Sequence, residues 1–375
     1  MKRSHFFLLV LAAAVFAALG WHLHRSEMGL WQETPLPPGA ALAGEFPVND
    51  VAEIRLRGPA GAVTLRRGDG GWTVAERAGY AANFEKISAL VRQLAGLKAV
   101  QDIPVADADL GRLNLRDPGE GVPPEEAAVA VGLQDAQGRA ISSVLLGKTH
   151  LVVPAGMPAE FGGAPAGRFV RPDKQPGRAY LVTETFADIQ ASPAAWIDPA
   201  YVRPGMARRI EVKGAGPDRS WVIDRGAQGA AWNLPGRSVP ADTSAAMNID
   251  SLFGGMAVAD APDGPDDARL KPLQETPVTV VADTFDGIRY TFVIGEGAGD
   301  NLPVKMRAEA LASQAPEDAS KARDEKLAEA ARFQDRAVFV PRKFVEPFLR
   351  PCPVVPPPAA PPTPAPSPAP KPKKK

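Results

Sequence analysis

Hydrophobic and polar residues alternate in two parts of the chain that lie far apart in the sequence. At 51–57 the sequence VAEIRLR alternates apolar with charged residues, and the same alternation returns around Val63 and around Trp72, with glycine-rich turns between them. A period of two is typical of a strand with one buried and one solvated face. We therefore predict a three-stranded antiparallel meander over residues 51–77.

The meander is followed by a segment with helical periodicity, AANFEKISALVRQLAGL. Asn83 is placed to cap the first turn, and Gly96 stands near the exit. One apolar stripe is formed by residues three and four positions apart, namely Phe84, Ile87, Val91 and Leu94. This pattern predicts a helix that covers the apolar face of the meander.

The second region repeats these landmarks in the same order. ARRIEVKG at 207–214 matches the first strand, Trp232 matches Trp72, and a weaker helical pattern follows at 242–255. The helix exit LAGLKAVQD at 94–102 has its counterpart in LFGGMAVAD at 252–260. Leu94 and Gly96 are thereby matched with Leu252 and Gly254.

Each region continues with an Asp/Gly-turn hairpin, at 128–147 and 277–295, and ends in one more strand, at 177–186 and 335–344. Matched landmarks in one order, each about 150 to 160 residues apart, indicate a tandem duplication. The alternative is two unrelated β-rich stretches with similar turns. We predict an α+β fold of two β-rich repeats, each an antiparallel sheet covered by one main helix.

An uncharged, mainly apolar run from Phe6 to Leu23 opens the chain after Lys2 and Arg3. At about 1.5 Å per residue this run nearly spans a hydrocarbon core of about 30 Å, so we expect an uncleaved transmembrane helix, with a cleaved signal peptide as the alternative. The expected anchor residues are Phe6, Leu8, Leu11, Phe16, Leu19, Trp21 and Leu23. The expected organisation is an anchor at 1–25, a linker at 26–45, repeat 1 at 46–203, repeat 2 at 204–350 and a tail at 351–375.

The charges that flank the apolar run predict its orientation. Lys2, Arg3 and the free amine outweigh Arg25, and positive flanks stay cytoplasmic. We expect a single-pass inner-membrane protein with a cytoplasmic N-terminus and a periplasmic body. Cys352 is the only cysteine, so no intramolecular disulfide forms.

Two further segments set the second half of the chain apart. Residues 308–334 are rich in Ala, Glu and Lys and predict a solvated helical insertion in repeat 2, which we expect to contact the partner. About half of the residues from 351 to 375 are proline, and the chain ends KPKKK. Such a tail favours extended polyproline II and is either a solubilising extension or a basic contact segment.

Several stretches resemble a known family, the bacterial envelope proteins that carry the domain of unknown function 4340. These stretches are GWTVAERAGYAANFEKISALVRQLAGLKAV, LGRLNLRDP and GRAYLVTETFADI, and WID follows the last. The resemblance covers most of 45–200 and, more faintly, 205–350. It implies an accessory component near ABC-type transport systems of the gliding-motility kind, and it implies no activity.

Composition and residue inventory narrow the chemistry. Lys plus Arg and Asp plus Glu are 43 each, so no overall field attracts nucleic acid. Of four histidines only His150 lies in the body, which argues against serine-triad chemistry and against His- or Cys-based metal sites. GKTH at 147–150 lacks the first glycine of a phosphate-binding loop. We expect no catalytic residue, no cofactor and no metal.

Acidic residues cluster in two loops, at Asp107 and Asp109 and at Asp263, Asp266 and Asp267, and we expect both clusters to be solvated. Neither has the spacing of a calcium loop. The sequence thus favours a non-catalytic, membrane-anchored envelope protein that binds an envelope partner, with ABC-type transport components suspected. The alternative is a carboxylate-dependent hydrolase that acts on an envelope polymer.

Overall fold

The computed structural model describes residues 39–153, 163–173, 175, 177–214, 219–235, 253–311 and 320–351. The chain forms two compact units, Met1–Asp198 and Pro199–Lys375. The predicted anchor, Leu252, most of the helical pattern at 242–255 and nearly all of the tail lie outside the described residues. Within the described residues, no helix is long and apolar enough to span a membrane.

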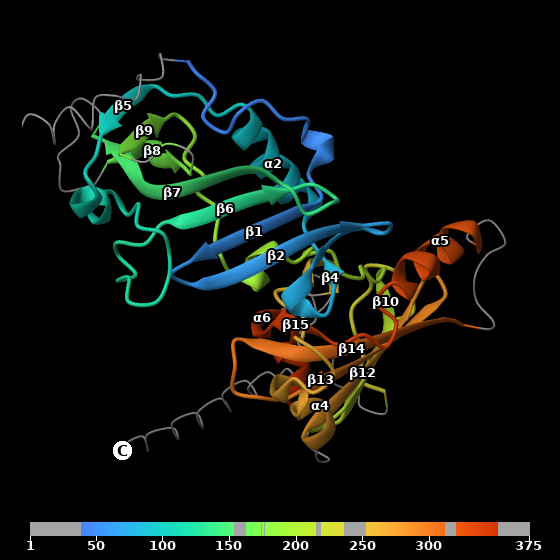
Figure 1. The fold of residues 1–375 in the computed structure, drawn as a ribbon. Coiled ribbons are helices and arrows are strands. Elements are labelled where there is room, and N and C mark those ends of the chain that lie inside the picture. Colours follow the sequence, from blue (N-terminus) through green and yellow to red (C-terminus); the bar gives the residue numbers. More distant parts are fainter. Residues whose placement is uncertain are drawn as a thin grey trace, which may run out of the picture. The chain divides into compact units, whose positions relative to one another are not determined.

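The first unit is built on a nine-stranded antiparallel sheet with the order β4-β3-β2-β1-β6-β7-β8-β9-β5 (Figure 1). Its strands are β1 Glu53–Gly58, β2 Gly61–Gly68, β3 Gly71–Val74, β4 Tyr80–Ala81, β5 Gln101–Pro104, β6 Val129–Gln134, β7 Ala140–Val152, β8 Ala164–Pro172 and β9 Arg178–Val182. The predicted meander is confirmed as β1, β2 and β3. Strand β5 follows the exit of the predicted helix, where the sequence predicts the next strand, whereas β4 and β8 were not predicted by the alternation.

One face of this sheet is covered by α2, Phe84–Ala95. Its Asn83 cap is confirmed, because the side chain accepts a hydrogen bond from the backbone N–H of Lys86 at 3.0 Å. Ile87, Leu90, Val91 and Leu94 are buried, as are alternate strand residues such as Ile54 and Leu56. Phe84 departs from the predicted stripe: it is 64% exposed, and the buried face of the helix begins at Ile87.

The opposite face of the first sheet carries a second apolar core. Strand residues of the other parity, such as Ala130 and Leu145, are buried there, since neighbouring residues of a strand face opposite sides. The cover comes from the segment that includes the 3₁₀ helix η3, Asp107–Leu113. It contributes Val105, Leu110 and Leu115. Both faces of the first sheet are therefore packed.

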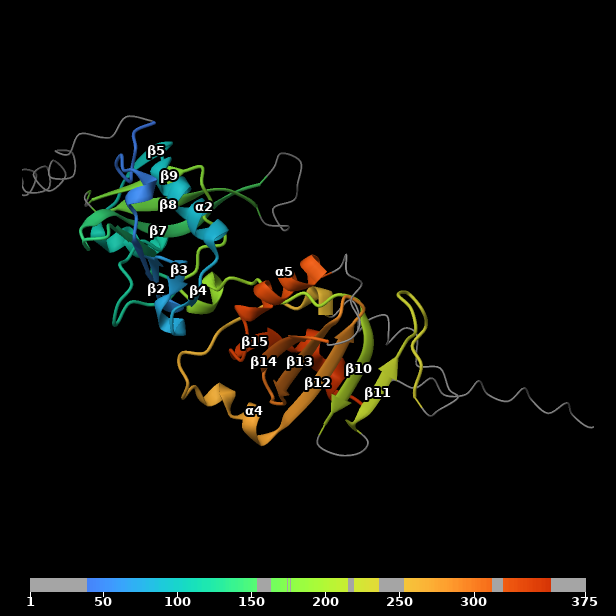
Figure 2. The same cartoon turned by 90° about the vertical axis from the view of Figure 1, so that its right-hand side faces the viewer.

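The second unit contains a six-stranded antiparallel sheet with the order β11-β10-β12-β13-β14-β15. Its strands are β10 Ala207–Lys213, β11 Trp221–Asp224, β12 Pro277–Thr284, β13 Ile288–Gly295, β14 Asn301–Ala310 and β15 Val338–Pro341. Its helices are η7 Ala268–Leu270, α4 Pro272–Glu275, α5 Ser320–Ala331 and α6 Arg342–Leu349. Figure 2 shows α4 beside one end of β12 and α5 toward the other end.

The core face of the second sheet is covered by α6. Its Val345 and Phe348 pack with Phe253 and Phe292, and the ring centroids of Phe253 and Phe348 are 5.2 Å apart. The prediction of a strand through residue 344 is wrong, because the strand ends at Pro341 and α6 begins at Arg342. A proline at the strand end suits this switch, since its ring fixes φ and leaves no N–H for the sheet.

Strand β14 and helix α5 share the segment predicted as a helical insertion. Residues 308–310 belong to β14, and α5 begins at Ser320. Most of α5 is exposed, but Ala330 is buried, and Lys326 forms an ion pair with Asp286 at 2.6 Å. The helix therefore packs on the second unit along one edge and leaves its other side to solvent.

The two sheets share a pairing scheme. Six neighbouring strands of the first sheet, β2-β1-β6-β7-β8-β9, correspond one by one to the six strands of the second, β11-β10-β12-β13-β14-β15. Every neighbouring pair in both sets is antiparallel. Registers correspond as well, since Ile54 pairs with Leu65 and Leu133 as Ile210 pairs with Ile223 and Ala282. Positions in the two sheets can therefore be compared residue by residue.

Candidate binding site on the second sheet

The back face of the second sheet, opposite α6, holds an open pocket of about 500 Å³. Strands β13 and β14 form its floor, and the segment from Pro265 to Gln274 forms one wall. Its lining residues are Pro265, Leu270, Leu273, Gln274, Thr291, Val293, Lys305, Met306, Arg307, Glu309 and Asp335. A volume in the range of about 300 to 1,000 Å³ with mixed apolar and polar walls is typical of ligand sites.

The charges around the pocket are unevenly paired. Arg307 forms an ion pair with Asp335 at 2.9 Å, and this hydrogen bond raises the pKa of the Arg307 guanidinium. Lys305 lies on the floor, is exposed, and forms no ion pair with any residue that the structure describes. Its ammonium group, beside the half-buried Val293 and Leu273, can donate hydrogen bonds to a carboxylate or phosphate from outside the chain.

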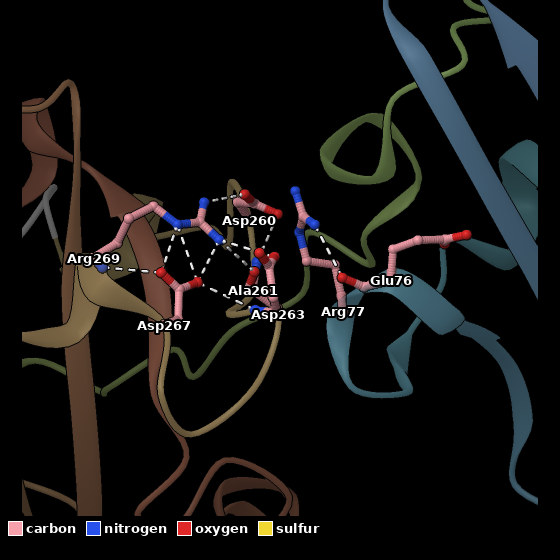
Figure 3. A network of polar contacts seen from close by, with 7 residues as sticks. All are labelled: Glu76, Arg77, Asp260, Ala261, Asp263, Asp267 and Arg269. Carbon is pink, nitrogen blue, oxygen red and sulfur yellow. Dashed lines mark hydrogen bonds and ion pairs between the residues drawn. The ribbon is translucent and has the colours of Figure 1, made fainter.

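A polar network centred on Arg269 holds the wall of the pocket (Figure 3). The guanidinium donates to Asp267 at 2.6 Å, to Asp260 at 2.8 Å and to Asp263 at 3.3 Å. It also stacks over the ring of Phe339, 4.4 Å from the ring centroid. Since Leu270 directly follows Arg269, this network fixes the segment that carries the apolar wall.

The network lowers the pKa of the Asp267 carboxyl group. Hydrogen bonds from the Arg269 side chain, then from the backbone N–H groups of Arg269 and Asp263, lower the pKa of Asp267 from 3.8 to about 2. The pKa of Arg269 is raised in turn by Asp267 and then by Asp260. The expectation that Asp267 is solvated is wrong: its side chain is 5% exposed, because the guanidinium covers it.

The same place in the first sheet is filled by the chain itself. Leu145 pairs with Ala130 and Arg171 in the first sheet, as Val293 pairs with Thr279 and Lys305 in the second. Leu145 is buried in the back-face core, whereas Val293 lines the pocket. The pocket therefore lies where the first unit has a packed peptide segment.

Two glycines show how closely the covering segments approach the sheets. A Cβ on Gly147 would lie 2.4 Å from the carbonyl oxygen of Leu113, and one on Gly295 would lie 2.6 Å from the backbone nitrogen of Leu273. Each covering segment therefore touches its sheet at one strand, β7 in the first unit and β13 in the second. Only in the first unit does the segment continue over the middle of the face with Leu110 and Val105.

The predicted landmark residues are framework, and they lie away from the pocket. Trp72 and Leu94 are buried in the first core, and the Gly96 N–H closes α2 by donating to the Arg92 carbonyl. Trp232 is buried beneath the Arg225 guanidinium, which lies 4.2 Å from its ring centroid. Gly254 is exposed beside the buried Phe253.

The other groups singled out in the sequence lie elsewhere. His150 packs edge-on against Phe169, with ring centroids 5.8 Å apart. Asp109 is 54% exposed and forms a 3.6 Å ion pair with Arg112. Among the described residues, no group of three or more His, Cys, Asp or Glu side chains is placed to hold a metal ion. The pocket itself was not predicted, although the sequence shows Lys305 as a charge in an otherwise apolar run with Pro303, Val304 and Met306.

Comparison with known protein families finds a match, which covers the sequence motifs that resemble this family. The pattern that defines the domain of unknown function DUF4340 matches residues 72–274, more than half of the 375 residues. This chain belongs to the DUF4340 family. The match begins at β3 and ends within α4, so it includes the wall of the pocket. No curated protein and no solved structure matches this DUF4340 chain.

Proposed function

We propose that this DUF4340 protein is a non-catalytic envelope protein that binds a partner protein through its second unit. The open pocket on the back face of the second sheet carries this proposal, because the equivalent face of the first sheet is closed by the chain itself. A face that is packed in one unit and open in the other is a natural place for a partner.

Binding is favoured over carboxylate-dependent hydrolysis by the direction of the pKa shifts. A hydrolase of that class needs one carboxylic acid with a raised pKa beside an ionised partner. The carboxyl groups with a shifted pKa in the described residues are instead shifted downward by basic neighbours: Glu53, Asp135, Glu211, Asp267 and Glu346. Such carboxylates form ion pairs and serve structure.

The pairing schemes support a common origin for the two units, and we propose an internal duplication. The shared strand order, the shared registers and the close approach of a covering segment at two equivalent glycines, Gly147 and Gly295, all favour it over two unrelated β-rich stretches. In this scheme Arg66 corresponds to Asp224. Arg66 pairs with Thr73 and Asp224 pairs with Asn233, so the residues just before these partners, Trp72 and Trp232, are equivalent. Duplication followed by opening of one back face explains how a binding site arose without loss of the fold.

Location and partner follow from the sequence. The apolar run from Phe6 to Leu23 and its basic flank support a single-pass inner-membrane anchor with the body in the periplasm. The family resemblance supports an ABC-type transport component as the partner.

A pair of reporter fusions after residue 350 tests location. An enzyme that is active only outside the cytoplasm should be active there, and an enzyme that is active only in the cytoplasm should be inactive. The fusion should sediment with membranes. The opposite pattern of activities would overturn the orientation, and release into the soluble periplasm would show cleavage near Gly20.

A further inference from the structure

We infer that the pocket on the second sheet binds an extended peptide segment that presents an aliphatic side chain and, next to it, a carboxylate. This inference rests on the proposed binding function and names the chemistry of the partner at that site. It follows from three features of the pocket: what fills the same place in the first unit, which lysine has no ion pair among the described residues, and how the wall is held.

The first feature is the occupant of the equivalent place in the first unit. There a segment of the chain itself lies across β6, β7 and β9, and its Val105, Leu110 and Leu115 pack on Ala130, Leu145 and Ala179. In the second unit the floor keeps an aliphatic residue, Val293, and the wall offers Leu270 and Leu273. The space is therefore shaped for a peptide with an aliphatic side chain.

The second feature is charge. The paired neighbours of Lys305 are Arg307 with Asp335 and, further along β13, Arg289 with Asp283 at 2.6 Å. Lys305 stands between the apolar wall and these pairs with no carboxylate partner among the described residues. Glu309, which also lines the pocket, lies opposite Arg289, and its charge adds to these ion pairs in raising the pKa of Arg289 and Arg307. An incoming carboxylate would therefore be the partner of Lys305, and the Thr291 hydroxyl and Gln274 amide are further hydrogen-bond donors in the lining.

Charge also separates this occupant from the tail of the chain itself. Residues 351–375 carry Lys371, Lys373, Lys374 and Lys375 and no acidic side chain. The tail would bring more positive charge to Lys305, whereas an acidic segment neutralises it. We therefore assign the pocket to a partner and not to the tail.

The third feature is preorganisation. Arg269 is held by Asp260, Asp263 and Asp267 and by the ring of Phe339, so the wall is in place before a partner arrives. A preformed wall reduces the entropy that binding must overcome. The pocket is therefore suited to one short peptide segment.

Peptide binding to the full-length protein in detergent tests the inference. The probes are two fluorescent hexapeptides with blocked ends, one of alternating Leu and Glu and one of alternating Leu and Lys. We expect the Leu/Glu peptide to bind at least about tenfold more tightly than the Leu/Lys peptide. Lys305→Glu should weaken Leu/Glu binding at least about tenfold and reverse the preference, and Lys305→Gln should give an intermediate loss.

The matched control is Lys148→Glu, which makes the same change at an exposed lysine in the first unit. It should leave binding of both peptides within about twofold of wild type. Circular dichroism of each variant checks that the fold is retained. Equal binding of the two peptides, or tighter binding of the Leu/Lys peptide by wild type, would overturn the inference, and the latter result would assign the pocket to the tail.

A competition experiment with lipid vesicles distinguishes a peptide carboxylate from a lipid phosphate as the ligand of Lys305. Vesicles of phosphatidylglycerol should not compete with the Leu/Glu peptide. Competition that disappears in Lys305→Glu would overturn the peptide assignment and identify an anionic headgroup as the ligand.

Photo-crosslinking in membranes separates this inference from the proposed function. A photoreactive residue is placed at Thr291 in the pocket, at Glu325 on the exposed side of α5, or at Asp69 in a turn of the first unit. We expect a discrete adduct from Thr291 that the Leu/Glu peptide suppresses and the Leu/Lys peptide does not. Adducts from Glu325 alone would overturn the pocket assignment and leave the binding function standing. No adduct from any of the three positions would count against both.

Discussion

At the scale of single residues, local signals were predictable and long-range partners were not. Asn83 and Gly96 act on backbone groups within a few positions of themselves, so their roles as caps follow from the sequence. Asp267 looked like a solvated loop acid. Its burial depends on Arg269, which in turn stacks on Phe339, seventy positions further along the chain, and no local pattern gives that contact.

The depressed pKa of Asp267 makes a pH-dependent prediction. Its folded-state pKa of about 2 lies below the ordinary 3.8, so ionised Asp267 stabilises the fold fully above about pH 4. That stabilisation is lost as the pH falls from about 4 toward 2. Because Arg269 is 44% exposed and its field is screened, we expect the loss to be about 1 to 2 kcal/mol.

Urea unfolding of wild type and Asp267→Asn at pH 7, 4 and 2.5 measures this loss. The variant should be less stable at pH 7, and the gap should shrink as the pH falls below 4. Asp263→Asn is the control, because that side chain is 66% exposed and its substitution should change little. A constant gap between wild type and Asp267→Asn across the three pH values would show that Asp267 does not titrate as a partner of Arg269.

At the scale of elements, strands with clear alternation were predictable, and elements whose character depends on tertiary contacts were not. The hairpins β1–β2 and β6–β7 follow from period two and glycine turns. The sequence Arg342–Phe344 has the alternation of a strand end, yet these residues begin α6, because Val345, Phe348 and Leu349 then reach the core face together. Helical spacing over so short a segment is ambiguous without the sheet it covers.

Two phenylalanines give the sharpest test of these elements. Phe348→Ala should lower the free energy of unfolding by about 3 to 5 kcal/mol, because the ring is 2% exposed and packs against Phe253. Phe84→Ala should change it by less than about 0.5 kcal/mol, because the ring is 64% exposed. Chemical denaturation of the two variants measures both effects. Equal losses would mean that the Phe84 ring is buried after all and that the stripe predicted from the sequence is the correct one.

At the scale of the whole molecule, the two units share a plan and differ in how their back faces are used. The shared strand order could be partly predicted from the sequence, because the landmark residues lie on strands and helix ends, where strand pairing fixes their spacing. The open back face of the second sheet could not be predicted from the sequence, because it depends on where a connecting segment lies in space. Residues 105–115 contain more Ala, Val and Leu than residues 264–275, but this composition does not say which segment crosses a sheet, and only the first does.

This difference predicts opposite outcomes for the same substitution at equivalent positions. Leu145→Asp places a charge in a packed core where Leu145 is 5% exposed, so we expect a loss of at least about 3 kcal/mol in the free energy of unfolding. Val293→Asp places the charge in an open pocket beside its cross-strand partner Lys305, so stability should change by less than about 1 kcal/mol.

The new carboxylate of Val293→Asp should occupy Lys305 and reduce binding of the Leu/Glu peptide at least about tenfold. Denaturant unfolding and peptide binding on the same preparations measure both effects, and Val293→Asn, which has nearly the same shape without the charge, is the control for sterics. Should Val293→Asp unfold the protein as Leu145→Asp does, the back face of the second sheet is a closed core like that of the first, and the site for a partner must lie elsewhere. A stable Val293→Asp that has lost peptide binding would show that the back faces of the two sheets differ in role, one serving the fold and the other serving recognition.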